Sequence, residues 1–179
     1  VDGDDSFAYR QLDRRVSELT GGLLSLGLRR GDRVAIIQEN NHRYVESVCA
    51  VARAGGVFVP MLGALTEREH GYMLADSEAS TLIALSPEGA ARAQRLAHER
   101  SNVCIIDWFG ATPRFPFPVS LECPCIDGAP SDLGQILYTS GTTGKPKGVM
   151  HSFGSISAGI AAWVTGVGIR HDDRLLGHF

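Results

Sequence analysis

The chain has 179 residues, of which 44% are hydrophobic and 21% are charged, and this composition is typical of a globular protein with one sizeable core. Its formal net charge of −3 provides no overall positive field, which excludes a general nucleic-acid-binding role. The cysteines match neither a disulfide framework nor a zinc-ligand spacing, so we expect free thiols in a cytoplasmic protein; they are Cys49, Cys104, Cys123 and Cys125.

The first third of the chain alternates between helical and strand patterns. Apolar residues spaced by four and three predict a helix over residues 12–26, which Gly27 is expected to end in the left-handed conformation. Short apolar runs predict strands over residues 34–37 and 57–59. The helix between these strands is expected to have one apolar face, formed by Val45, Val48, Cys49 and Ala52.

The same alternation continues along the next 50 residues or so. Thr66 and Glu69 form a capping-box pattern, which predicts a helix over residues 67–76. Further elements are expected in turn: a strand over residues 81–85, a helix that begins at Ser86 and Pro87, and a strand over residues 103–106. Strands that alternate with helices of this length need crossover connections, so we expect a three-layer α/β fold in which helices flank a mainly parallel sheet.

Two stretches depart from this alternation. Five of the eight prolines lie between residues 113 and 130, so residues 108–132 are expected to form an irregular connection inside one partial domain, residues 1–179, that is cut at both ends. Residues 148–169 lack charged side chains, but only 12 of these 22 residues are strongly apolar and five are glycine. We therefore expect no membrane span there, but a buried turn and helix with a core stripe of Ile156, Ile160, Trp163 and Val167.

The most informative segment is residues 139–148, which read Thr-Ser-Gly-Thr-Thr-Gly-Lys-Pro-Lys-Gly after an apolar strand pattern at residues 136–138. Glycines allow the backbone to curl so that its N–H groups surround an anion. Hydroxyl groups donate hydrogen bonds to phosphate oxygens, and lysines supply compact positive charge. This mixture favours a phosphate-binding loop, although a plain surface turn rich in glycine and threonine remains an alternative.

The segment is not a Walker-type phosphate loop. That motif places four residues between its two glycines and a serine or threonine after its lysine. Here two residues separate Gly141 from Gly144, and Pro146 follows Lys145. The dinucleotide-binding pattern of three spaced glycines is absent as well, so the P-loop kinases and GTPases are excluded.

Residues 139–148 resemble the signature of the adenylate-forming superfamily, which includes acyl-CoA synthetases, luciferases and the adenylation domains of peptide synthetases. The signature reads Ser/Thr-Ser-Gly-Ser/Thr-Thr-Gly-x-Pro-Lys-Gly, and every position fits. The resemblance extends to other characteristic segments of the family, at residues 7–12, 31–35, 53–60 and 65–77. The resemblance implies that ATP phosphates are contacted by Thr139, Ser140, Gly141, Thr142, Thr143, Gly144 and Lys147.

The resemblance also implies a reaction. Such enzymes join a small carboxylic acid to ATP, usually with Mg²⁺, and many then pass the acyl group to CoA; the Thr142-Thr143 pair is the form more usual in these acyl-CoA ligases. The family's catalytic lysine would lie beyond Phe179, so this portion of the N-terminal domain is expected to hold no catalytic residue and to be inactive alone. A non-catalytic nucleotide- or partner-binding module of the same fold stays open as the alternative.

Some positions depart from the family or remain to be placed. Phe153 stands where many members have histidine, and Leu62 and Gly63 stand where many have Asn-Pro, so the acid substrate stays unassigned. The six histidines show no metal-ligand spacing, and we expect surface or structural roles for them. His151 is the exception to examine, because it lies three residues after the loop.

Overall fold

The computed structural model describes residues 6–98, 102–109, 126, 128–139, 145–170 and 172–173. Helices and strands alternate as expected from the sequence. In chain order they are α1 (Tyr9–Ser25), β1 (Arg33–Gln38), α2 (His42–Arg53), β2 (Val57–Leu62), α3 (Glu67–Asp76), β3 (Thr81–Ala84), α4 (Pro87–His98), β4 (Cys104–Asp107), β5 (Leu133–Thr139), β6 (Lys147–Ser152) and α5 (Phe153–Val167).

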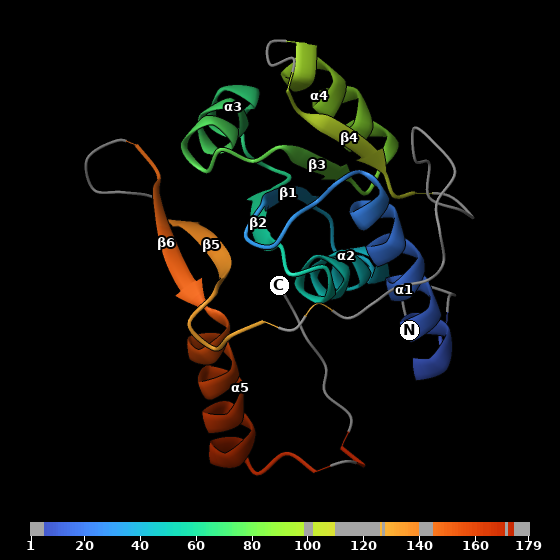
Figure 1. Ribbon diagram of the computed structural model, residues 1–179, viewed down its shortest axis with the longest axis vertical. Helices are drawn as coiled ribbons and strands as arrows, with labels where there is room; N and C mark the ends of the chain where they lie inside the picture. The colour runs from blue at the N-terminus through green and yellow to red at the C-terminus, as the bar shows by residue number, and fades with distance from the viewer. Residues whose placement is uncertain are drawn as a thin grey trace.

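The strands form one mixed sheet in the order β4-β3-β1-β2-β5-β6. Every neighbouring pair is parallel except β5 and β6, which are antiparallel. Side chains alternate between the two faces of β1: Val34 and Ile36 pack with α1 and α2, whereas Ala35 and Ile37 pack with α3 and α4. Figure 1 shows these two helix pairs on opposite sides of the strands, which confirms the three-layer α/β architecture.

Local sequence signals explain where the helices begin and end. Gly27 and Gly55 follow α1 and α2 with φ angles of +84° and +72°, in the left-handed region that favours glycine. At the start of α3, the Glu69 backbone N–H donates to Thr66 Oγ1 at 3.3 Å and the Thr66 N–H donates to Glu69 Oε2 at 2.8 Å. The Gly89 N–H donates to Ser86 Oγ at 3.0 Å, so the expected cap of α4 is confirmed.

The buried face of α2 differs from the expected one. Val45 is 49% exposed and Cys49 is also exposed, whereas the helix buries Glu46, Ser47, Ala50 and Val51. The reason is a polar contact inside the core. The Glu46 carboxylate accepts hydrogen bonds from Arg15 Nε at 2.5 Å and from Trp108 Nε1 at 2.9 Å, which turns this charged residue inward.

Two expectations for the last third of the chain are wrong. The sequence predicts a helix directly after the loop, but residues 147–152 form β6, whose apolar pattern is interrupted by Lys147, Gly148, His151 and Ser152. The helix that follows was expected to be buried, yet none of the 15 residues of α5 is buried and Trp163 is 56% exposed. Figure 1 shows why: α5 extends away from the sheet, and beyond its first turn none of the described helices or strands covers it.

The connection expected over residues 108–132 is described only at its ends. Trp108 is buried in the core beneath α1 and α2, and the Ile126 N–H donates to the Arg53 carbonyl at 3.2 Å. Residues 110–125 and 127 lie outside the described residues, as do Cys123 and Cys125. Within the described residues, no helix is both long and apolar enough to cross a lipid bilayer.

Candidate functional site

The expected phosphate loop connects two adjacent antiparallel strands. Thr139 ends β5, Lys147 begins β6, and the two residues lie directly opposite each other in the strand register. Residues 140–144 lie outside the described residues, and these are Ser140, Gly141, Thr142, Thr143 and Gly144. The structure therefore describes the base of the loop, which lies at the carboxyl end of β5, the edge where open parallel sheets bind ligands.

The register places the two described candidate ligands on the same face of the hairpin. Residues directly opposite in an antiparallel pair direct their side chains to one face, with Cβ atoms about 5 Å apart. Thr139 and Lys147 are such a pair, and both are exposed. A hydroxyl donor and an ammonium group therefore flank the loop on one side, which is the chemistry that a phosphate needs.

The amino end of β5 is fixed to the rest of the domain through Asp132. Arg30 Nε donates to Asp132 Oδ2 at 2.8 Å, and the same oxygen accepts the Ala129 N–H at 2.8 Å. The Ala129 N–H and the Arg30 guanidinium hold the pKa of Asp132 below its ordinary range. The Phe153 N–H donates to the Asp132 carbonyl at 2.9 Å, so one residue links β5, α5 and the turn before β1.

Phe153 has a packing role where many family members carry histidine. A Cβ atom on Gly134 would lie 3.0 Å from Phe153 Cδ1 and 3.2 Å from Ile156 Cδ1. The glycine therefore lets the first turn of α5 pack closely on β5. His151 pairs with Gln135 in the register between β6 and β5 and is half-buried, so it lies along the hairpin and not at its loop end.

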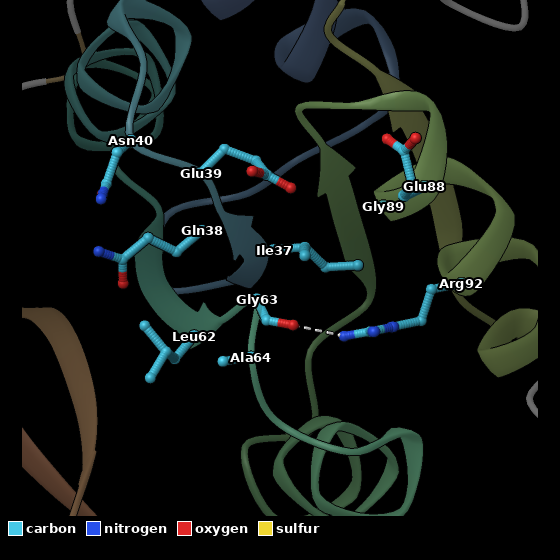
Figure 2. Close-up of a pocket in the computed structure, with 10 residues that line it drawn as sticks. All are labelled: Ile37, Gln38, Glu39, Asn40, Leu62, Gly63, Ala64, Glu88, Gly89 and Arg92. Carbon is cyan, nitrogen blue, oxygen red and sulfur yellow. Dashed lines mark hydrogen bonds between the residues drawn. The ribbon is translucent and has the colours of Figure 1, made fainter.

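A pocket of about 340 Å³ lies at the same sheet edge, where β1 and β2 end and α4 begins (Figure 2). From β1 the chain crosses to β2 toward one edge of the sheet, and from β3 it crosses to β4 toward the other edge. The pocket lies at this change of direction, the position at which open α/β sheets bind ligands. Its walls are formed by Ile37, Gln38, Glu39, Asn40, Leu62, Gly63, Ala64, Glu88, Gly89 and Arg92.

Polar groups in this pocket are held in place by the backbone and by one another. Arg92 Nη1 donates to the carbonyls of Gly63 at 2.7 Å and Leu65 at 3.0 Å, which fixes the guanidinium at the pocket wall. Ser86 Oγ donates to Glu39 Oε1 at 2.9 Å. This pocket was not predictable from local sequence patterns, because its polar residues come from separate parts of the chain. The departure from the family at Leu62 and Gly63 is the one sequence feature that falls on its wall.

The described residues provide little for a metal ion by themselves. Across the described ranges, no three His, Cys, Asp or Glu side chains gather closely enough to hold one. A Mg²⁺ ion that accompanies ATP keeps several waters, binds the phosphates and takes only one or two protein carboxylates, so it needs no dedicated cluster of side chains.

His70 is fully buried and contacts a residue of the pocket wall. Its Nε2 lies 3.0 Å from the Leu62 carbonyl, so this nitrogen carries the proton, whereas Nδ1 has no hydrogen-bond partner. Burial lowers the pKa of His70 below its ordinary value of 6.5. The Leu62 hydrogen bond and the nearby Glu69 and Glu67 oppose this shift, and Arg92 adds to it.

We expect the folded state to lose stability as the pH falls below 6.5, the ordinary pKa of histidine. The unfolded chain protonates its histidine first, so acidification through this range favours unfolding. Urea denaturation at several pH values between about 5 and about 7.5 measures the effect, with the slope expected for one proton. His70→Gln should flatten this slope, and the exposed His98→Gln control should leave it unchanged. An equal slope in His70→Gln would contradict the assignment.

Comparison with known proteins identifies the family. The model of the family described as AMP-binding enzyme matches residues 1–178. The chain is 35% identical over 176 residues to a feruloyl-CoA synthase of an Amycolatopsis species, covering 97% of this chain and 34% of that protein. It is 30% identical over 176 residues to a long-chain-fatty-acid–CoA ligase of Mycobacterium tuberculosis, covering 97% of this chain and 35% of that protein. The chain thus spans about a third of the length of these relatives.

Solved structures agree with this match. Apo MatB from Rhodopseudomonas palustris superimposes with a TM-score of 0.82 at 27% identity, over 94% of this chain and 34% of MatB. The ATP-bound form of MatB superimposes with a TM-score of 0.78 at 28% identity, over 90% of this chain and 32% of MatB. Because the family model covers nearly every residue and the fold agrees, the chain belongs to the family of AMP-binding enzymes.

Proposed function

We propose that the protein activates a carboxylic acid with ATP, forming an acyl-adenylate and pyrophosphate, and then transfers the acyl group to CoA. The observation that carries the proposal is the hairpin of β5 and β6, which places Thr139 opposite Lys147 at the base of the signature loop. Family membership and the ATP-bound form of a structural neighbour support it. The two relatives named above are CoA-ligating enzymes, which supports CoA as the acceptor.

The proposed contribution of this chain is positioning and charge neutralisation. A carboxylate is a poor electrophile until one of its oxygens becomes part of a good leaving group, and joining it to AMP provides that group. In-line attack on the α-phosphorus requires the β- and γ-phosphates to be held still while negative charge moves onto them. Backbone N–H groups of residues 140–144, the Thr139 hydroxyl and the Lys147 ammonium are the donors that this role needs.

The proposed binding of ATP is tested first on this chain alone. Isothermal titration calorimetry with ATP and Mg²⁺ should give saturable binding of one nucleotide, and AMP, which lacks the β- and γ-phosphates, provides the control at the same concentration. Pyrophosphate release, assayed with fatty and aromatic acids, should stay at background, because the family's catalytic lysine is expected downstream. Release by this chain at the rate of a whole enzyme would contradict the expected inactivity, and absence of ATP binding would contradict the proposed function.

The acceptor is tested on the whole protein that contains this chain. ATP, an acid and CoA together should yield AMP and the acyl-CoA thioester, and omission of CoA should leave the acyl-adenylate bound. ATP binding without AMP formation, for every acid and thiol tried, would favour the alternative, a non-catalytic nucleotide-binding module of the same fold. Mass spectrometry of the thioester from a mixed panel of acids identifies the preferred substrate.

A further inference from the structure

Tyr138 directly precedes the signature loop, and its side chain is hydrogen-bonded to helix α3. Its hydroxyl donates to Asp76 Oδ2 at 2.8 Å, and Asp76 is the last residue of α3. Tyr72, one turn earlier on α3, donates to the other carboxylate oxygen of Asp76 at 3.4 Å. The two tyrosine rings meet edge to face, with their centroids 6.5 Å apart, and both pack against the core beneath α3 and α4.

The last glycine of the signature makes room for this arrangement. Gly148 lies opposite Tyr138 in the register between β5 and β6. A Cβ atom on Gly148 would lie 2.8 Å from Ile136 Cγ2 and 3.3 Å from Tyr138 Cζ, and a contact under 3.0 Å forces a shift. The Tyr138 ring therefore packs against the backbone of Gly148. This contact is on the face of the hairpin opposite to Thr139 and Lys147.

Ile136 is buried in the core, and beyond it the contact of Tyr138 with α3 links the loop end of β5 to the domain. The parallel register between β2 and β5 is at Phe58 and Gln135, before the last four residues of β5. Beyond that point β5 is paired with β6, and the first turn of α5 packs at Gly134, near the start of β5. Arg30 and Asp132 fix the start of β5, and Tyr138 with Asp76 fixes its end.

We propose that Tyr138, Asp76 and Gly148 form a brace that positions the phosphate loop. Tyr138 and Asp76 act as positioning residues, and Gly148, which has no side chain, leaves room for the tyrosine ring. None of the three contacts the nucleotide in this proposal; they fix the strand end from which Thr139 and Lys147 flank the loop. The nucleotide part of the inference rests on the proposed function. Burial and the Asp76 carboxylate raise the pKa of Tyr138, so its hydroxyl stays a donor across the physiological range.

The first test of the brace needs no nucleotide. Hydrogen exchange of the free chain, followed at the amides of Thr139 and Lys147, should become about tenfold faster in Tyr138→Phe, since a hydrogen bond to a carboxylate is lost. Asp76→Ala should match it, whereas Asp76→Asn keeps an acceptor and should restore most of the protection. The matched control, Tyr72→Phe, removes only the 3.4 Å contact and should change exchange less than about twofold.

The second readout is ATP affinity, measured by calorimetry on the same variants. Tyr138→Phe and Asp76→Ala should each weaken binding about three- to tenfold, and the double variant should be no weaker than either single one, because both remove one contact. Gly148→Ala should also weaken binding, because its Cβ would press on Ile136 and on the Tyr138 ring. Unchanged exchange and affinity in Tyr138→Phe would overturn the brace. Faster exchange in a chain that fails to bind ATP even as wild type would keep the brace and overturn the proposed function.

Discussion

Replacing Arg15 with methionine is expected to lower the free energy of unfolding by about 3 kcal/mol, because the buried carboxylate of Glu46 loses its guanidinium partner and keeps only the more distant His42, whose Nε2 lies 4.0 Å away. Glu46 is fully buried, and Arg15 binds it through Nε at 2.5 Å and Nη2 at 3.1 Å. The Trp108 Nε1–H is the other strong donor to this carboxylate, at 2.9 Å. Methionine keeps the apolar stem of Arg15, so the loss reports the charge.

A matched control lies one residue away. Arg14 pairs with Glu18 across one helical turn, but the Arg14 side chain is 79% exposed. Arg14→Met should therefore cost less than about 0.5 kcal/mol. Adding Glu46→Gln to Arg15→Met should recover part of the loss, because a neutral amide needs no countercharge and still accepts from Trp108. Urea denaturation measures all three variants, and equal stability of Arg14→Met and Arg15→Met would refute the role of this ion pair.

Lys147→Ala is expected to weaken ATP binding about 10- to 100-fold, the range that corresponds to loss of one charge-assisted hydrogen bond to phosphate. The residue is exposed and shares a face of the hairpin with Thr139 at the base of the loop. Its backbone role in β6 does not depend on the side chain, so the fold should survive. Calorimetry with ATP and Mg²⁺ on the variant chain measures the change.

Lys145 provides the comparison within the same loop. It occupies the variable position of the signature and is exposed, two residues before Lys147. Lys145→Ala removes the same charge, and we expect its effect on affinity to stay below about threefold. If both variants weaken binding equally, the interaction is a general attraction to positive charge, and the specific role assigned to Lys147 is wrong.

The sequence predicted most elements of the fold because their signals are local. The capping box of Thr66 and Glu69, the cap at Ser86 and the left-handed Gly27 each act within a few residues, and the structure confirms all three. The face of α2 was not predictable in this way. Glu46 is buried by Arg15 and Trp108, which lie 31 and 62 residues away in the chain, and hydrophobic periodicity carries no information about such a pair.

The site was predicted in part. The signature placed the loop between residues 139 and 148, and the pairing of Thr139 with Lys147 is compatible with that assignment, although ATP contacts by these residues remain a prediction. The antiparallel strand β6 was missed, because Lys147 and Gly148 resemble loop residues and only Val149 and Met150 are strongly apolar. Trp163 was wrongly expected in a core, since periodicity shows that a helix has an apolar face but not what covers it.

The most direct test of a phosphate-binding loop is hydrogen exchange of the wild-type chain with and without saturating ATP and Mg²⁺. We predict that the backbone amides of residues 139–148 exchange more slowly by about tenfold or more when the nucleotide is bound, because loop N–H groups donate to phosphate oxygens. The amides of α5 should not respond. Protection confined to the pocket at Gln38, Leu62 and Arg92, with none at residues 139–148, would contradict the central claim.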